Sequence, residues 1–172
     1  EVIEGEIDAA GLGGAGLHAS RSGIACLIAD DDEDACEMAA EILGFLPDHN
    51  GAVAPFVETA DPSDRLNPDL ESLVPDNPNR PYDMVKVVEE IVDDGHFMEL
   101  FEAYADNIII GFARLGGRTV GVIGNQPKVL AGCLDIDASI KAARFIRTCD
   151  AFNVPLLTLE DVPGFLPGVV QE

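Results

Sequence analysis

The chain has 172 residues, and 52 of them are Leu, Ile, Val or Phe, which is enough for one globular domain with an apolar core. Thirty-two acidic residues against ten basic ones give a formal net charge of −22, which argues against binding to nucleic-acid phosphates. No apolar run approaches the ~20 residues of a membrane-spanning helix, and no signal peptide opens the sequence.

The acidic residues are spread along the whole chain, and only three lysines accompany them. Acidic, lysine-poor surfaces suit molar salt, where the Debye length falls to about 3 Å and charge repulsion is screened. We therefore expect a halophilic protein of the cytoplasm. The alternative is an acidic protein without salt adaptation.

Neither the cysteines nor the histidines have the spacing of a metal site, because no CxxC pair or short His repeat occurs. These residues are Cys26, Cys36, Cys133, Cys149, His18, His49 and His96. We expect no metal in this part, and four buried free thiols in a reducing compartment.

The first thirty residues contain a glycine-rich run, GLGGAG at positions 11–16, which fits the GxGxxG pattern. A dinucleotide site needs a long helix after these glycines. Only residues 17–22 stand between them and Gly23, and an apolar strand is expected next, at 24–29. The spacing therefore argues against a dinucleotide site.

Two helices and a linker are predicted next. The apolar spacing of Ala35, Met38 and Ile42 predicts a helix over 34–45. Residues 47–81 hold seven of the eleven prolines, which predicts an ordered linker between two lobes. A second helix is expected over 83–92, with Asp83 as its N-cap.

The second half of the chain predicts a hairpin followed by a βαβ unit. Strands are expected at 97–101, 107–115 and 118–125, the last two joined by a two-residue turn at Gly116 and Gly117. A helix over 138–152, capped by Asp137 or Ser139, then leads to an apolar strand at 155–160, of the kind covered on both faces. Strands 118–125 and 155–160 should lie parallel, with the helix covering one face of the sheet.

The loop after this last strand, residues 161–168 (DVPGFLPG), is the first candidate site, because ligands of such sheets bind beyond the carboxyl ends of the strands. Pro163 and Pro167 fix φ, while Gly164 and Gly168 allow left-handed backbone. A rigid turn of this kind can hold backbone N–H groups where an oxyanion forms. On composition alone, a turn without chemistry is the alternative.

Several stretches of the sequence together resemble one family. They are 61–66 (DPSDRL), 81–84 (PYDM), 104–108 (YADNI), 124–127 (GNQP), 132–136 (GCLDI), 142–145 (AARF) and 161–168 (DVPGFLPG), with Gly14-Ala15, His18 and Ser22-Gly23 upstream. In this order they resemble the carboxyltransferase (beta) subunit of biotin-dependent acyl-CoA carboxylases, of the propionyl-CoA and acetyl-CoA carboxylase type. The departures are small: Cys26 stands where the family usually has His, and Asp137 where Asn is common.

The resemblance implies an α/β, crotonase-like fold, with the end of the N-terminal half in residues 1–50 and the start of the C-terminal half in 51–172. It implies a carboxyltransferase that moves a carboxyl group from carboxybiotin to the α-carbon of a short-chain acyl-CoA. A non-catalytic crotonase-fold assembly module is the alternative. A crotonase-type hydratase is disfavoured, because no pair of acid–base glutamates is marked in the sequence.

In this family, negative charge develops on the ureido oxygen of biotin and on the thioester oxygen, and backbone N–H groups stabilise both. We therefore expect no catalytic side chain. By position, Gly164 and Phe165 would face biotin, while Asp161, Pro163, Pro167 and Gly168 would brace the loop. The family's principal glycine-rich oxyanion holes correspond to segments outside this sequence.

The same resemblance implies partners. Biotin would arrive on a separate chain or domain, since no Met-Lys-Met biotinylation word occurs, so a biotin carboxylase and biotin carrier subunit is expected. A homo-oligomer of dimer pairs, a hexamer, is expected as well. The sequence looks cut at both ends, and we expect this piece to be inactive alone.

Six of the ten basic residues fall close together in the sequence: Arg114, Arg118, Lys128, Lys141, Arg144 and Arg147. Lys141 and Arg144 are three residues apart and share a helix face. They could contact the phosphates of coenzyme A or acidic groups of a partner. The alternative is ion pairing within the chain.

Overall fold

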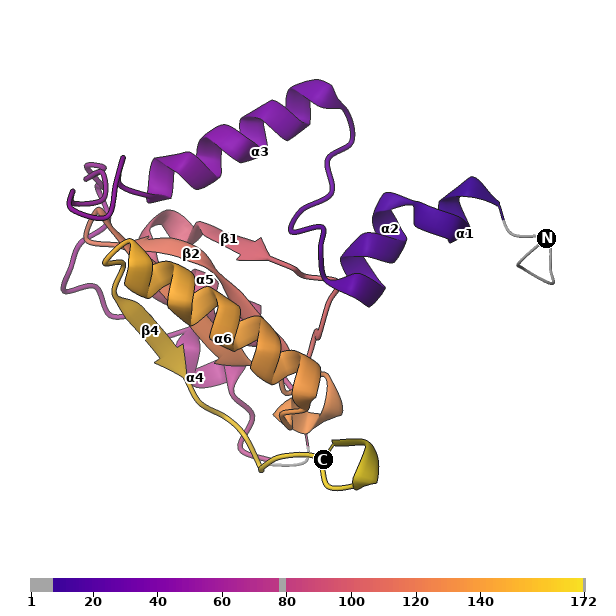
Figure 1. Ribbon diagram of the computed structural model, residues 1–172. Helices are drawn as coiled ribbons and strands as arrows, with labels where there is room; N and C mark the ends of the chain where they lie inside the picture. Colours follow the sequence, from indigo (N-terminus) through magenta and orange to yellow (C-terminus); the bar gives the residue numbers. More distant parts are fainter. Residues whose placement is uncertain (1–7, 78–79, 172) are drawn as a thin grey trace.

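The structure is a computed structural model that describes residues 8–77 and 80–171. A mixed four-stranded sheet in the order β1-β2-β3-β4 forms its centre (Figure 1). The strands are β1 (Phe97–Leu100), β2 (Ile108–Leu115), β3 (Arg118–Asn125) and β4 (Leu156–Leu159). β1, β2 and β3 are antiparallel neighbours, and β4 pairs with β3 in parallel. The longest helices are α3 (Asp32–Phe45), α5 (Met84–Ile91) and α6 (Ile136–Ala151).

The turn between β2 and β3 is the predicted two-residue hairpin. Leu115 pairs with Arg118, and both glycines between them have positive φ, 57° at Gly116 and 74° at Gly117. Positive φ at both central positions is the type I′ geometry that matches the twist of two strands. The carboxylate of Asp93 accepts a hydrogen bond from each glycine N–H, at 2.9 and 2.6 Å, and thereby fixes the turn.

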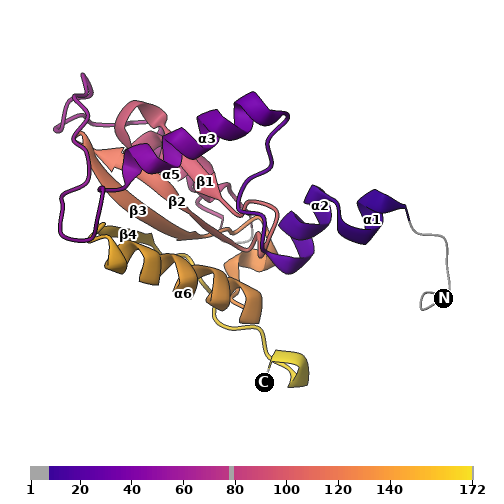
Figure 2. The ribbon, with the colours of Figure 1, turned by 45° about the horizontal axis from the view of Figure 1, so that its top comes forward.

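Alternation along the strands divides the core between the two faces of the sheet. Ile108, Ile110 and Phe112 of β2 pack on the side of α3 and α6, whereas Ile109 and Ala113 pack on the side of α5. Figure 1 shows α6 in front of the sheet and α5 behind it, and Figure 2 shows α3 running over β1 and β2. Covering both faces explains why β2 and β3 are almost continuously buried.

The predicted parallel unit of β3, α6 and β4 is confirmed, with Gly121 opposite Leu156 in the register. A Cβ built on Gly121 would lie 2.6 Å from Cys149 Sγ, so glycine at this position lets α6 approach the sheet closely. The chain therefore places the loops that follow β3 and β4 at the same edge of the sheet.

The details of α6 differ from the prediction. The helix begins at Ile136, and Asp135, rather than Asp137 or Ser139, is its N-cap, accepting from the N–H of Ala138 at 2.8 Å. Ile140 and Ile146, which recur at helical spacing in the sequence and would be expected to face the core, are 39% and 41% exposed. The face that packs on the sheet is Ala138, Lys141, Phe145 and Cys149. Because this face includes the buried Lys141, the positions of the apolar residues alone did not indicate which face of the helix packs on the sheet.

Two strand predictions are also corrected. β4 is not covered on both faces, because Leu156 is 42% exposed and no residue of the strand is fully buried. Among the described strands it is also an edge strand, since it pairs only with β3. Residues 24–29 form no strand. Their backbone instead makes a single contact with the β1–β2 connection, from the N–H of Phe101 to the carbonyl of Cys26.

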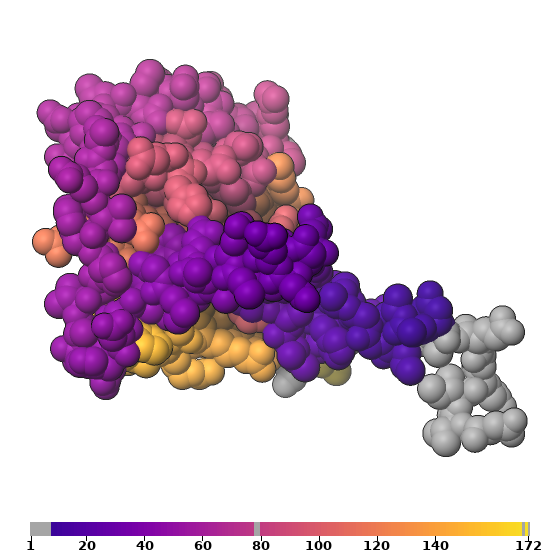
Figure 3. Space-filling model, turned by 90° about the horizontal axis from the view of Figure 1, so that it is seen from above, coloured from indigo at the N-terminus to yellow at the C-terminus, as the bar shows by residue number. Residues whose placement is uncertain are grey.

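The N-terminal segment is helical, in three short turns that project from the body of the molecule (Figure 3). They are α1 (Ala9–Gly13), α2 (Ala15–Leu17) and the π-helical turn η1 (His18–Ser22). The glycine-rich run lies across α1 and α2, so it forms no strand-to-helix loop for a dinucleotide, in agreement with its spacing.

The described part of the predicted linker, residues 47–77 and 80–81, contains one short helix, α4 (Leu70–Leu73). Its role as a connection between two lobes stays a prediction. Arg65 donates to the carbonyls of Glu90 and Val92, and Asn67 donates to the carbonyl of Glu90, which ties the linker to the end of α5. The N-cap of α5 is Asp83, as expected.

α3 begins at Asp32, two residues earlier than predicted, because the Asp31 carboxylate caps it through the N–H groups of Glu33 and Asp34. Phe45 at its end is fully buried and stacks on Phe112 of the sheet, with ring centroids 5.7 Å apart. α3 thus shares a core with the second half of the chain, and the division at residue 50 stays a prediction.

No helix in the described ranges is long and apolar enough to cross a membrane.

Candidate functional site

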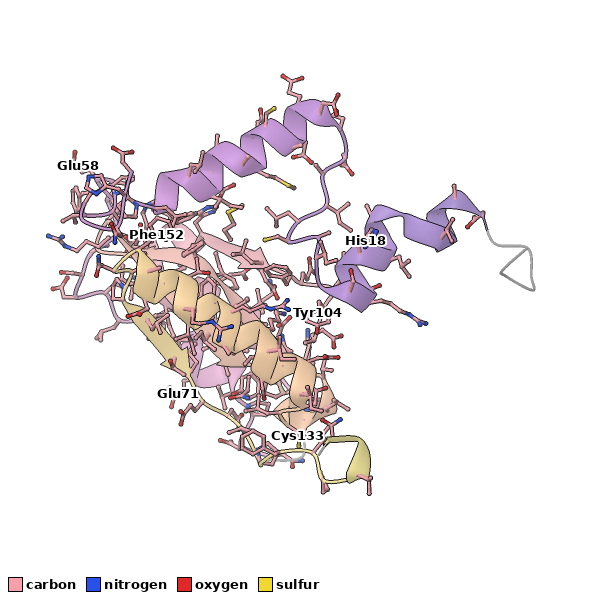
Figure 4. The ribbon with its side chains drawn as sticks, viewed as in Figure 1. His18, Glu58, Glu71, Tyr104, Cys133 and Phe152 are labelled. Carbon is pink, nitrogen blue, oxygen red and sulfur yellow. The ribbon has the colours of Figure 1, made fainter. Side chains whose placement is uncertain are left out.

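Two loops meet at the carboxyl ends of β3 and β4. The first runs from Gln126 to Asp135, and the second is the predicted loop 161–168. They are joined by an isolated parallel bridge: the N–H of Leu134 donates to the carbonyl of Gly164 at 3.1 Å, and the N–H of Leu166 donates to the carbonyl of Leu134 at 2.8 Å. Figure 4 shows Cys133, in the first loop, close to the segment that follows β4.

The first loop is held by buried amide side chains. Asn125 donates to the carbonyl of Gly132 at 3.0 Å, and Asn107 donates to the carbonyl of Cys133 at 2.8 Å. Gln126 accepts from the N–H of Met84 and donates to Asp83. Each of the three amide residues is at least nine-tenths buried, and each forms a hydrogen bond to a backbone group. The sequence marked these residues only as part of the family words.

The turn within this loop has strained backbone. Leu130, Ala131 and Gly132 have φ values of 50°, 54° and 76°, and only glycine adopts that region without cost. A Cβ on Gly132 would lie 2.6 Å from the carbonyl oxygen of Asp161, so the two loops touch here. The N–H groups of Leu130 and Ala131 donate to no acceptor in the described residues. Successive free N–H groups of this kind form a concave site for an anionic oxygen.

The second loop has the backbone that its glycines predict. Gly164 and Gly168 have φ of 149° and 136°, and nothing lies within 4 Å of a Cβ built on either. The N–H groups of Gly164 and Phe165 donate to no acceptor within 8–77 and 80–171. Phe165 is 74% exposed, so this residue lies at the surface of the protein. Pro163 and Pro167 are exposed on either side.

Asp161 anchors the second loop at its start. Its carboxylate accepts a hydrogen bond of 2.7 Å from the hydroxyl of Tyr82, which precedes α5. Its N–H donates to the side chain of Asn125 at 3.4 Å. Burial and the neighbouring carboxylate raise the pKa of Tyr82 to about 12, so the phenol stays protonated and remains a donor. The predicted bracing role therefore has a partner that the sequence did not reveal.

A cleft of about 720 Å³ opens between these loops and the linker. Its lining includes Arg80, Tyr82, Lys128, Ala131, Asp161 and Pro163. Lys128 donates to Asp83 at 2.6 Å. Burial alone would raise the pKa of Asp83, but hydrogen bonds from Lys128 and Gln126 outweigh it and hold the pKa below its ordinary value. The N-cap of α5 is therefore an ionised carboxylate at neutral pH.

Lys141 does not reach the surface, which leaves its ammonium unsuited to the phosphate contact expected of it. The residue is 3% exposed and donates to the carbonyls of Tyr104 and Ile108, both at 2.8 Å, and of Ala105 at 3.4 Å. Burial lowers its pKa to about 8. Arg144, one turn further, is exposed and has no ion pair within the described chain, so its role stays a prediction.

The remaining candidates are the cysteines and the histidines. No group of three or more His, Cys, Asp or Glu side chains that could hold a metal occurs in the residues the structure describes. All four cysteines are free, but only Cys149 is buried, and Cys36 is exposed, contrary to our expectation of four buried thiols. His96 pairs with Glu41 at 2.6 Å, which fastens β1 to α3.

Comparison with known proteins supports the resemblance. The carboxyl transferase domain model matches residues 1–172. The chain is 55% identical over 161 residues to the mitochondrial propionyl-CoA carboxylase beta chain of Sus scrofa, covering 94% of this chain and 30% of that one. It is 52% identical to methylmalonyl-CoA decarboxylase subunit alpha of Veillonella parvula, covering 97% and 33%. The chain thus spans about a third of the length of these relatives.

The fold agrees with a solved relative. The crystal structure of transcarboxylase 12S with methylmalonyl-coenzyme A and methylmalonic acid bound matches with a TM-score of 0.93 and 45% identity. The match covers 97% of this chain and 32% of that one, and it confirms the crotonase-like α/β fold that the sequence words implied. Family model, relatives and fold lead to one conclusion: the chain belongs to the carboxyl transferase family.

Proposed function

We propose that this chain takes part in carboxyl transfer from carboxybiotin to the α-carbon of a short-chain acyl-CoA such as propionyl-CoA or acetyl-CoA. The observation that carries the proposal is the pair of loops at the carboxyl ends of β3 and β4. Each exposes two consecutive backbone N–H groups without an acceptor in the described residues, at Leu130 and Ala131 and at Gly164 and Phe165. The type of reaction is inferred from membership of the carboxyl transferase family.

Such donors suit a reaction in which charge develops on oxygen. Removing a proton from the α-carbon of a thioester moves negative charge onto the thioester oxygen, and fixed N–H groups stabilise it without an ionisable side chain. Removing a single donor of this kind costs about 10²–10³ in rate in known cases. The buried amides Asn107 and Asn125 would keep the first loop in place, and Asp161 with Tyr82 would do so for the second.

Biotin, when bound, supplies the carboxyl group. Its ureido carbonyl is a hydrogen-bond acceptor, which fits free N–H donors better than it would fit a cluster of carboxylates. Gly164 and Phe165 would hold it, with Pro163, Pro167 and Gly168 fixing the backbone on either side. The one carboxylate of the loop, Asp161, is already engaged by Tyr82.

Partners follow from the same proposal. Biotin would be carried by a biotin carboxylase or carrier subunit, on another chain or domain. A homo-oligomer is supported by the solved transcarboxylase 12S, whose structure is described as a hexamer assembly.

The direct test is to supply a purified protein that contains this chain with a carboxylated biotin carrier and propionyl-CoA. Formation of methylmalonyl-CoA is the expected result, with acetyl-CoA compared under the same conditions. A folded, assembled protein that transfers no carboxyl group to either substrate would instead support the non-catalytic assembly module.

A further inference from the structure

A separate cavity of about 240 Å³ lies between α3, α6 and the β1–β2 region. Its walls are mostly apolar and come from three parts of the chain: Ile42 and Leu46, then Leu100, Ile110 and Phe112, then Phe145. Cavities of about 150 Å³ with similar Leu, Ile and Phe linings stay dry and bind small apolar molecules. This cavity is therefore large enough for an apolar ligand.

Two residues that line the cavity, Gly23 and Tyr104, lie in close contact with each other. Gly23 has φ of 56°, and a Cβ built on it would lie 2.7–2.8 Å from carbon atoms of the Tyr104 ring. The hydroxyl of Tyr104 donates to Asp137 at 2.9 Å, which keeps the ring in place. Figure 4 shows Tyr104 between α6 and the turn that contains His18.

The charge around the cavity is opposite to that of the chain as a whole. No Asp or Glu is among the lining residues, although the chain has 32 acidic residues. The two charged residues that line it are Lys141 and Arg144. The Lys141 ammonium is held by three carbonyls, and the acids that act on it, Glu99, Glu102 and Asp106, do not line the cavity.

Arg144 is the group left to meet a ligand. It is exposed, it lines the cavity, and in the part of the chain that the structure describes its guanidinium makes no ion pair or side-chain hydrogen bond. Thr148, one turn along α6, also lines the cavity, and its hydroxyl donates to the carbonyl of Arg144 at 3.1 Å. An arginine at the edge of an apolar cavity is suited to a carboxylate on an apolar chain.

We propose that this cavity binds an aliphatic monocarboxylate, a fatty acid with an unbranched chain, with the chain among Ile42, Ile110 and Phe145 and the carboxylate on Arg144. The site is distinct from the loops of the proposed carboxyl transfer and does not depend on that reaction. No residue of the two loops lines it.

Isothermal titration calorimetry with sodium octanoate tests the site directly, in a purified protein that contains this chain. Saturable binding at one site per chain is expected. Arg144→Gln should weaken it about tenfold, because the carboxylate loses its charged hydrogen-bond donor. Arg147→Gln is the matched control: it lies on the same helix, outside the cavity, and should leave the affinity unchanged. 1-Octanol should bind Arg144→Gln as well as it binds the wild type.

Two substitutions at Thr148 test whether the ligand occupies the cavity, and neither changes the charge of the protein. Thr148→Phe should abolish octanoate binding, whereas Thr148→Val, which keeps the size of the residue, should preserve it. Circular dichroism checks that each variant folds. Equal affinities in the Arg144 and Arg147 variants, unchanged binding to a folded Thr148→Phe, non-saturable binding, or displacement of octanoate by propionyl-CoA would each overturn the proposal.

Discussion

Leu134 and Phe165 lie side by side in a parallel bridge, 31 positions apart in the chain, and hold the two candidate loops together. The bridge uses the N–H and the carbonyl of Leu134, the carbonyl of Gly164 and the N–H of Leu166. It leaves the N–H groups of Gly164 and Phe165 free of any acceptor in the described chain. The bonding that fixes the second loop is thus separate from the donors that it exposes.

The contact between Tyr82 and Asp161 should support this loop from outside. Tyr82→Phe removes one hydrogen bond of 2.7 Å, and we expect it to lower the free energy of unfolding by about 1 kcal/mol. Asp161→Ala should have a similar effect, and the double variant should cost no more than either single variant. Urea unfolding of the three proteins forms the double-mutant cycle. Strictly additive losses would show that the two residues do not stabilise each other.

The buried ammonium of Lys141 should make stability depend on alkaline pH. Burial lowers its pKa from 10.5 to about 8, so between these values the unfolded chain binds more protons than the folded one. Stability from this group therefore rises as pH increases from about 8 toward 10.5. From about pH 8 to 10.5, the free energy of unfolding of the wild type should therefore increase relative to that of Lys141→Met.

At neutral pH, Lys141→Met should be less stable than the wild type by ~2 kcal/mol or more, because the carbonyls of Tyr104 and Ile108 lose their donor in the interior. Lys86→Met is the control, since Lys86 forms only an exposed pair with Glu89 and should change little. A pH-independent difference between the wild type and Lys141→Met would contradict the assignment.

Glu99 should make the free energy of unfolding fall as pH rises, in a lower pH range than that of Lys141. Burial raises its pKa from 4.5 to about 7, although the charge of Lys141 opposes the shift. The folded state then binds more protons than the unfolded state between these values. The stability that this provides is complete below about 4.5 and is lost as pH rises through 7.

Glu99→Gln should therefore flatten the fall in unfolding midpoint between pH 4.5 and 7, as measured by thermal denaturation. Glu71→Gln, an exposed residue of α4 whose charge does not act on Glu99, serves as the control. Equal pH profiles for the wild type and Glu99→Gln would show that this carboxyl titrates normally.

Salt should stabilise the protein. Only four ion pairs occur in the described ranges, whereas the formal net charge is −22, so repulsion between acids is largely uncompensated. Screening by KCl from 0.1 M upward should raise the unfolding midpoint steadily. A flat or falling midpoint would favour an acidic protein without salt adaptation, and an equal gain in sucrose would show that charge is not the cause.

The strands and the hairpin were predictable because their signals are local. Gly116 and Gly117 specify their own turn, and the Val and Ile content of β2 and β3 marks a sheet covered on both faces. The face of α6 was not predictable from periodicity. Lysine is usually exposed, so the sequence does not indicate that Lys141 is buried. Its burial depends on hydrogen bonds to the carbonyls of Tyr104 and Ile108, which lie more than 30 positions away in the sequence.

The candidate site was predictable in part. Its position followed from the order of strand, helix and strand, and the backbone of Gly164 and Gly168 followed from residue type. The left-handed turn at Leu130 and Ala131 gave no signal, because neither residue favours positive φ. Tertiary contacts impose that conformation, chiefly through Asn125 on Gly132 and Asn107 on Cys133. Such contacts are invisible in a single sequence.

The central claim is that free backbone N–H groups of the second loop act in carboxyl transfer. Gly164→Val places a branched side chain at φ of 149°, where no neighbour would clash but the backbone must move. Steady-state kinetics of the intact enzyme should show kcat reduced about 100-fold with the KM for propionyl-CoA little changed, because the donors act mainly in the transition state. Gly168→Val, with similar strain and space but outside the donor pair, should be affected much less. A folded Gly164→Val enzyme with unchanged turnover would contradict the account.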